Sequence, residues 1–180
     1  MSQKIETLVL PGYGNSGPQH WQSIWESADQ SFKRVMQDDW EHPELKEWIA
    51  RLDEVAAAIG DSFSIAAHSL GCLLVAHWAS RSPHAAKVKG ALLVAVPDPG
   101  GPAFPAPIRG FSVLPTARLP FPSIVVASND DPYATVEFSQ CCAKNWGSRI
   151  VDVGSRGHIN ASSGLGNWEE GKNLLRSLAG

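Results

Sequence analysis

Short apolar runs alternate with longer stretches of helical periodicity along almost the whole chain, and no other feature constrains the fold as strongly. Several runs are apolar nearly throughout, as is typical of strands that are covered on both faces. This alternation predicts βαβ units, and therefore a mostly parallel sheet of about six strands with helices on both faces. The expected strands span residues 5–10, 33–37, 63–67, 90–96, 123–128 and 149–153. The expected helices span residues 19–29, 43–59, 70–81, 135–146 and 167–178.

Length and composition bound the classes of protein to which the chain can belong. Its 180 residues fit one domain, 1–180, which is large enough to bury a substantial core. A formal net charge of −3 provides no footprint for nucleic acid or for an anionic membrane, so neither is expected as a partner. No stretch is apolar for long enough to span a bilayer, and residues 1–6 contain no apolar signal region. Because three cysteines do not suggest a disulfide framework, we expect a reduced, cytoplasmic protein.

One segment, residues 97–122, interrupts the alternation. It is rich in proline and glycine and shows no clear period. A loop of this length in a compact domain is usually functional or disordered. Its apolar residues Phe104, Ile108, Phe111 and Leu114 favour an ordered loop over the active face, and a plain surface excursion stays open as the alternative.

A small–x–Ser–x–Gly pattern is centred on Ser69, between the expected strand 63–67 and the expected helix 70–81. This strand–turn–helix context is the one that a nucleophile elbow requires, because a sharp turn lifts the serine hydroxyl above the sheet. Ala67 stands where the pattern often has glycine, and a methyl group still fits there. The turn also brings the start of a helix beside Ser69, so the backbone N–H of Leu70 can donate to a developing oxyanion. The sequence therefore predicts Ser69 as a nucleophile.

A serine nucleophile needs an oriented base, and two later loops supply candidates. His158 follows the expected strand 149–153, at the same sheet edge as Ser69. The expected strand 123–128 runs into Asp130 and Asp131, and we predict Asp131, directly before a proline, as the residue that orients His158. Asp130 is the fallback, and a helix-capping aspartate is the structural alternative. The chain order Ser, Asp, His is that of the α/β-hydrolases.

The first expected strand ends in a glycine-rich turn that allows two interpretations. As part of a hydrolase it brings a second oxyanion donor to the site, and we nominate the backbone N–H of Tyr13. The turn also has the spacing Gly12-x-Gly14-x-x-Gly17 of a dinucleotide-binding fingerprint, with acidic residues about twenty positions on. The proline directly after Gly17 suits the first turn of a helix that begins there, so Gly17 would lie before the helix. This argues against NAD(P) binding, because the fingerprint needs its third glycine inside the helix and packed on the strand.

Other residues carry weaker signals. His20 and Trp21 open the first expected helix near the oxyanion loop and are candidates for the pocket lining, together with Phe104. Simple helix packing is the equally open alternative for His20 and Trp21. His68 neighbours the nucleophile but points away from it on a sharp turn, so we assign it a structural role. No set of histidine, cysteine and carboxylate residues has metal-ligand spacing, so we expect neither a metal nor another cofactor.

The chain resembles the retinoblastoma-binding protein nine and YdeN-like family of small serine hydrolases. The resemblance rests on Leu10-Pro11-Gly12-Tyr13-Gly14, His20-Trp21, Gln37-Asp38-Asp39-Trp40, Ala67-His68-Ser69-Leu70-Gly71, Ser128-Asn129-Asp130-Asp131-Pro132-Tyr133 and Gly157-His158-Ile159-Asn160. It implies a compact α/β-hydrolase fold without a large cap domain, and a triad of Ser69, His158 and Asp131. Pocket-protein binding is not expected, because the nearest match to a Leu-x-Cys-x-Glu motif, at residues 70–74, lacks the glutamate.

These observations together predict a serine hydrolase that cleaves small carboxylic esters, or amides, through an acyl-enzyme and without a cofactor. Two alternatives remain: a non-catalytic binding module on a hydrolase scaffold, and an NAD(P)-binding protein. A short acyl group is the expected substrate moiety, because no cap domain is long enough to build a deep tunnel.

Overall fold

The computed structural model describes residues 6–178 and contains one six-stranded, wholly parallel sheet. The strands lie in the order β2-β1-β3-β4-β5-β6. They are β1 (Glu6–Leu10), β2 (Phe32–Arg34), β3 (Phe63–His68), β4 (Val88–Val94), β5 (Ser123–Ala127) and β6 (Arg149–Asp152). All six predicted strands are confirmed within a few residues; the expected start of the first, Ile5, and the expected absence of a signal region in residues 1–5 lie outside the described residues.

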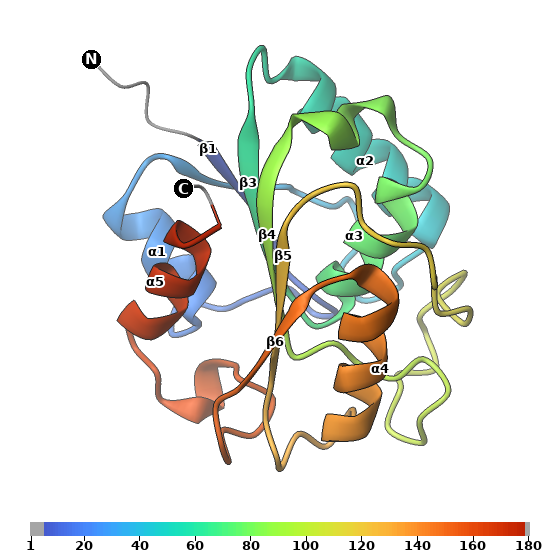
Figure 1. Ribbon diagram of the computed structural model, residues 1–180, viewed down its shortest axis with the longest axis vertical. Helices are drawn as coiled ribbons and strands as arrows, with labels where there is room; N and C mark the ends of the chain where they lie inside the picture. The colour runs from blue at the N-terminus through green and yellow to red at the C-terminus, as the bar shows by residue number, and fades with distance from the viewer. Residues whose placement is uncertain (1–5, 179–180) are drawn as a thin grey trace.

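Within residues 6–178, five α-helices cover the two faces of the sheet, as the alternation predicts (Figure 1). They are α1 (Trp21–Ala28), α2 (Leu45–Ala58), α3 (Leu70–Ala79), α4 (Val136–Trp146) and α5 (Glu169–Arg176). Helices α1 and α5 lie on one face, and α2, α3 and α4 lie on the other. Two 3-10 helices, Pro83–Lys87 and Ala161–Ser163, add to the predicted elements. Among the described residues, no helix is both long and apolar enough to cross a membrane.

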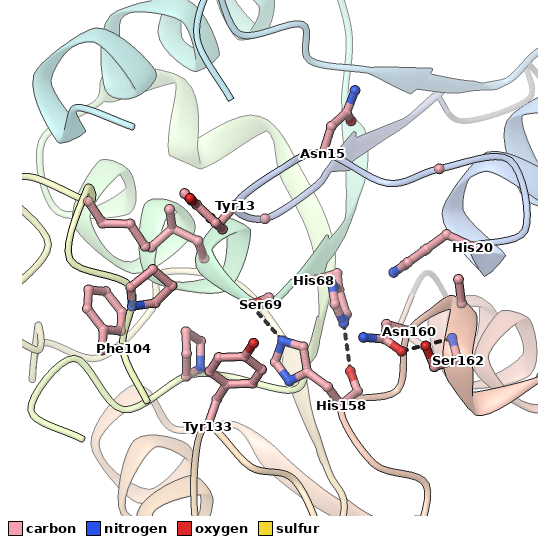
Figure 2. A pocket seen from close by; sticks show the side chains of 17 residues that line it. Tyr13, Asn15, His20, His68, Ser69, Phe104, Tyr133, His158, Asn160 and Ser162 are labelled. Atoms are coloured by element: carbon pink, nitrogen blue, oxygen red, sulfur yellow. Dashed lines mark hydrogen bonds between the residues drawn. The ribbon is translucent and has the colours of Figure 1, made fainter. Parts of the chain in front are cut away.

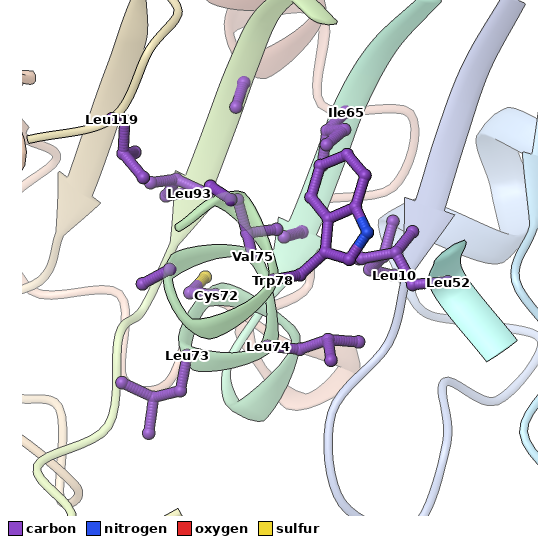
Figure 3. Packing of buried hydrophobic residues seen from close by; sticks show 14 of the residues in the cluster. Leu10, Leu52, Ile65, Cys72, Leu73, Leu74, Val75, Trp78, Leu93 and Leu119 are labelled. Atoms are coloured by element: carbon purple, nitrogen blue, oxygen red, sulfur yellow. The ribbon is translucent and has the colours of Figure 1, made fainter. Parts of the chain in front are cut away.

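The larger core lies between the sheet and helices α2, α3 and α4 (Figure 3). Helix α3 is buried along its entire length, and α2 turns its apolar stripe of Leu45, Trp48, Leu52 and Ala56 toward it. The Trp78 indole N–H of α3 donates to an Asp53 carboxylate oxygen of α2 at 2.9 Å, so the buried polar atom is satisfied. A central helix without a solvent face fixes the position of the turn that precedes it.

The second core, under α1 and α5, is dominated by tryptophan. Trp21 and Trp25 of α1 lie 4.5 Å apart between ring centroids, and Trp168 packs 5.1 Å from Trp21. All three side chains are buried against the face of the sheet that presents Ala66 and Leu92. Large rings bury much apolar area with few rotatable bonds, which makes this layer rigid.

Residues 97–122 form an ordered excursion between β4 and β5. Phe111 is fully buried in the larger core, and Phe104, Ile108 and Leu114 pack against that core from the loop. The backbone of Arg109 is bonded in both directions, its N–H to Pro43 O at 2.9 Å and its carbonyl to Leu45 N–H at 3.1 Å. The prediction of an ordered loop is therefore confirmed over that of a plain surface excursion.

Candidate active site

Ser69 lies on the sharp turn between β3 and α3, in a backbone conformation that residues other than glycine rarely adopt. Its φ is 53° and its ψ is −123°. Backbone strain of this kind costs on the order of 1–3 kcal/mol and persists only where the surroundings impose it. Here the Ser69 N–H donates to Val94 O at 2.9 Å, and α3 passes so close to β1 that a Cβ on Gly71 would lie 2.3 Å from Leu10 O. The small residue predicted at position 71 is thus required by the close approach of helix and strand.

Three side chains from the carboxyl edge of the sheet form one continuous chain of hydrogen bonds. His158 Nε2 lies 2.8 Å from Ser69 Oγ, and His158 Nδ1 lies 2.9 and 3.0 Å from the two carboxylate oxygens of Asp131. Figure 2 marks the contact between His158 and Ser69 with a dashed line. The side chains of His158 and Asp131 are 9% and 4% exposed, so water screens their interaction little. Asp131 also accepts the Tyr133 N–H at 2.9 Å, which fixes the carboxylate. The structure thus joins the three residues that the sequence nominated.

The neighbouring carboxylate of Asp130 has different partners. One of its oxygens accepts the Ser128 hydroxyl at 2.8 Å and the Gly157 N–H at 2.7 Å. The Gly157 N–H is the main reason why the pKa of Asp130 lies below its ordinary value. Asp131, and not the fallback Asp130, therefore contacts the imidazole. Asp130 instead connects the loop after β5 to the loop that carries His158.

Two buried rings hold the backbone of the His158 loop. The ring of His68 donates from Nε2 to His158 O at 2.8 Å, and the Trp21 indole N–H donates to Ile159 O at 2.9 Å. Ile159 has a φ of 48°, an outlier for a β-branched residue, and Gly157 has a φ of 56°. These two donors, which come from β3 and α1, thus fix two successive carbonyls of a strained peptide next to the predicted base.

His68 and His20 form a neutral cluster behind His158. The ring centroid of His68 lies 4.6 Å from that of His20 and 4.9 Å from that of His158. Burial is the main cause that lowers the pKa of His68 well below its ordinary value, and burial likewise lowers the pKa of His20 to about 4. A neutral His68 that bonds a carbonyl through Nε2 carries its proton on that nitrogen. The structural role assigned to His68 is therefore a specific one, toward the loop of His158.

A cavity of about 240 Å³ opens over Ser69, and its lining contains no Asp, Glu, Lys or Arg side chain among the described residues. His20 and Phe104, two of the predicted pocket residues, line it. The prediction for Trp21 is wrong: this side chain is buried in the second core and its N–H is engaged by Ile159 O, so it supports the site from below. Several further residues line the cavity that no sequence pattern indicated, namely Asn15, His68, Pro97, Pro105, Tyr133, Asn160 and Ser162.

The loop after β1 packs directly on the elbow. A Cβ on Gly12 would lie 2.8 Å from Ser69 Cβ and 3.1 Å from Leu70 N, so only glycine permits this approach. Tyr13 and Leu70 both line the cavity. Leu70 is the first residue of α3, and the N–H groups of a first helical turn have no partner within the helix. This geometry suits the two residues nominated as oxyanion donors.

The dinucleotide interpretation fails on the third glycine of its fingerprint. Gly17 lies in a turn before α1, which begins at Trp21 with His20 as its N-cap. A Cβ on Gly17 would meet nothing within 4 Å, whereas the fingerprint needs this glycine for close packing of helix on strand. The close helix–strand approach is made by Gly71 instead.

The cavity lies at the switch point of the sheet, where the chain leaves β1 for β2 on one side and β3 for β4 on the other. A parallel sheet with a serine on such an elbow, and an acid and a histidine after later strands, defines the protein as an α/β-hydrolase. A family model described as "Serine hydrolase" matches residues 7–177, and the chain belongs to this family.

Solved structures agree with this assignment. A YdeN-like hydrolase from Pectobacterium atrosepticum has 29% sequence identity and a TM-score of 0.85, over 99% of this chain and 92% of that one. The ydeN gene product of B. subtilis is 17% identical, with a TM-score of 0.77 over 97% of this chain and 98% of that one. A thermophilic esterase from Thermogutta terrifontis shares the fold at 13% identity, with a TM-score of 0.70 over 98% of this chain and 91% of that one. A comparison with curated protein sequences gave no match.

Proposed function

We propose that this serine hydrolase cleaves small carboxylic esters through an acyl-enzyme, with Ser69 as nucleophile, His158 as general base and Asp131 as the residue that orients the base. The observation that carries the proposal is the unbroken path from the Asp131 carboxylate through both ring nitrogens of His158 to Ser69 Oγ. A serine hydroxyl is a weak nucleophile until such a base takes its proton.

In the proposed reaction Ser69 Oγ attacks the ester carbonyl while His158 Nε2 takes the hydroxyl proton. The carbonyl oxygen becomes negative and accepts hydrogen bonds from the N–H groups of Leu70 and Tyr13, each such donor being worth about 3 kcal/mol of barrier. The C–O bond to the alcohol then breaks, and the imidazolium gives its proton to the departing oxygen. Water, activated by the same histidine, releases the carboxylic acid from Ser69. Asp131 stabilises the imidazolium in both halves of the reaction.

The apolar side chains of the 97–122 loop are proposed to hold the acyl group. Phe104 and Ile108 line the cavity beside the oxyanion loop. The cavity has a volume of about 240 Å³, and we propose that it takes a short acyl chain. Acetyl to butyryl esters are the proposed range.

Hydrolysis of p-nitrophenyl acetate and butyrate by the wild type and by Ser69→Ala tests the proposal. We expect turnover by the wild type and a loss of at least about 10⁴-fold in kcat in the variant. Wild-type protein that is folded and turns over neither ester would contradict the proposal and favour a binding role for the same cavity. Circular dichroism of both proteins establishes that they are folded.

A further inference from the structure

The cavity over Ser69 has two chemically different sides. Phe104 lies on one side of Ser69 with the rings of Tyr13 and Tyr133. The polar side chains of His20, Asn160 and Ser162 lie on the other side, as Figure 2 shows. An ester has two halves, the acyl group and the alcohol, and the two sides face different halves. The apolar side is assigned above to the acyl group, which leaves the polar side without a role.

His20 presents a hydrogen-bond donor to the polar side. Its side chain lines the cavity although the residue is only 4% exposed. Its Nδ1 accepts the Gln22 N–H at 3.1 Å, so in the neutral ring the proton is on Nε2. This Nε2 is buried and has no hydrogen-bond partner among the described residues. The edge contact with the ring of His68 is a weak substitute for an acceptor oxygen. A buried donor without an acceptor is costly, and a ligand oxygen would relieve that cost.

Asn160 presents a second donor. Its Oδ1 accepts the Ser162 N–H at 3.0 Å, which turns its Nδ2 in the opposite direction, toward His158 in Figure 2. Within residues 6–178, no hydrogen-bond acceptor contacts this Nδ2. The capping box of the 3-10 helix Ala161–Ser163 holds the side chain in this orientation.

The polar side lies next to His158 Nε2, the atom that protonates the departing alcohol oxygen. In the proposed reaction His158 Nε2 gives its proton to the departing oxygen, so the alcohol lies on the His158 side of the cavity. Asn160 follows His158 by two residues. The His20 ring lies 4.6 Å from that of His68, which in turn lies 4.9 Å from that of His158. No charged side chain among the described residues lines the cavity, so an ionised group on the alcohol would be desolvated without a counterion.

We infer that His20 and Asn160 form a subsite for an uncharged oxygen acceptor on the leaving alcohol, and that the enzyme prefers monoesters of short diols or polyols to esters of simple alcohols. The inference rests on the proposed ester hydrolysis and adds the class of alcohol to it. On collapse of the tetrahedral intermediate the C–O bond breaks, the alkoxide takes the proton of His158 Nε2, and the free diol leaves.

A matched pair of substrates tests the inference. In 2-hydroxyethyl butyrate a hydroxyl group stands where propyl butyrate has a methyl group, so the two esters have the same length and differ only in this terminal group. We expect the wild type to prefer the hydroxyethyl ester in kcat/KM by about 10-fold, since a site built around a donor discriminates against an analogue without the acceptor.

Two variants of His20 separate the donor from the helix cap. In His20→Asn the amide oxygen takes the place of Nδ1 and keeps the helix cap, but no atom reaches the place of Nε2. The preference for the hydroxyethyl ester is therefore expected to fall to less than 2-fold. In His20→Gln an amide nitrogen reaches that place, and the preference is expected to be largely retained. Thr135→Ala removes a cap from α4, away from the cavity, and serves as the control that leaves the preference at its wild-type value.

Equal kcat/KM of the wild type for both esters would overturn the inference, as would a His20→Asn variant that loses activity on both equally. Fluorophosphonate labelling distinguishes failure of the proposed alcohol preference from failure of the proposed hydrolase activity. A protein that is labelled on Ser69 and cleaves p-nitrophenyl butyrate, but cleaves neither of the two alkyl esters, refutes the alcohol class and leaves the hydrolase proposal standing. A protein that is neither labelled nor active refutes both.

Discussion

The two sides of the cavity are built in different ways, although both are formed by loops at the same edge of the sheet. The side that carries His158 is held by hydrogen bonds between residues far apart in the chain, from His68, Trp21 and Asp130 to a short loop with a strained backbone. The side formed by residues 97–122 presents apolar side chains to the cavity and the core, with Phe111 as its buried anchor, and backbone hydrogen bonds of Arg109 and Leu119 tie it to neighbouring segments.

This difference matches what each side has to do. Proton transfer requires heavy atoms at hydrogen-bond distance, and directional bonds in a water-poor interior provide that precision. An acyl pocket only has to exclude water and fit a chain of carbon atoms, for which non-directional packing is sufficient. We therefore expect substitutions on the first side to affect kcat, and those on the second to affect the choice of acyl group.

The largest effect is expected at Asp131. Asp131→Asn keeps the size of the side chain but removes the charge that stabilises the imidazolium, and kcat should fall about 10⁴-fold at neutral pH. Asp130→Asn is the matched control, since that residue bonds the Gly157 N–H and not the imidazole; its kcat should fall less than about 10-fold. The comparison is made by steady-state kinetics on p-nitrophenyl butyrate. Equal losses in the two variants would be inconsistent with the assignment of Asp131.

The histidine side should also make stability depend on pH. The folded pKa of His20 is about 4, whereas an unfolded chain protonates histidine near 6.5. The unfolded state therefore binds a proton first as pH falls, so stability is complete above about pH 6.5 and declines toward pH 4. Between pH 7 and pH 5 the wild type should lose about 2 kcal/mol more unfolding free energy than His20→Asn. Urea unfolding at both pH values measures the difference, and identical losses in the two proteins would argue against a buried neutral His20.

A smaller effect is expected at the indole that supports the His158 loop. Trp21→Phe removes the N–H bonded to Ile159 O, and we expect kcat to fall about 10-fold with little change in KM, because one buried hydrogen bond is lost. Trp25→Phe is the matched control, since its indole bonds Asn167 O in the same helix layer. Both variants should lose comparable stability in thermal melts, but only Trp21→Phe should lose kcat. A parallel loss of kcat in both would show that the effect is general loosening.

The smallest effect is expected on the apolar side. Phe104→Ala should reduce the preference for butyrate over acetate about 5-fold in kcat/KM, because the extra methylenes lose an apolar contact. Val113→Ala in the same loop changes a side chain that is 70% exposed and should leave the preference unaltered. A Phe104→Ala variant that loses kcat on both esters alike would place this loop in the chemistry and erase the contrast between the two sides.

The sequence could predict the features that arise from local patterns, but not those that depend on contacts between distant segments. The strands, the helices and the elbow at Ser69 are local patterns, and the rule that parallel strands end at one edge was enough to bring Asp131 and His158 to Ser69. Residue-level contacts between distant segments were out of reach. The bond from His68 to His158 O spans ninety positions, and no periodicity encodes it.

The error at Trp21 has a physical cause. Helix α1 begins at Trp21 with His20 as its cap, later than the expected start at residue 19. The direction of the Trp21 side chain is decided by its packing against Trp25 and Trp168, which are contacts between separate elements that a local pattern does not encode. Likewise, Asn160 was visible only as a neighbour of His158, and the turn of the 3-10 helix that aims its amide was not predicted.

The most direct test of the central claim is the reaction of the intact protein with a fluorophosphonate, followed by peptide mass spectrometry. We predict one adduct per chain, located on Ser69, and no adduct after Asp131→Asn on the same timescale, because only an oriented base activates this hydroxyl. An unlabelled wild-type protein, or an adduct on another residue, would contradict the account.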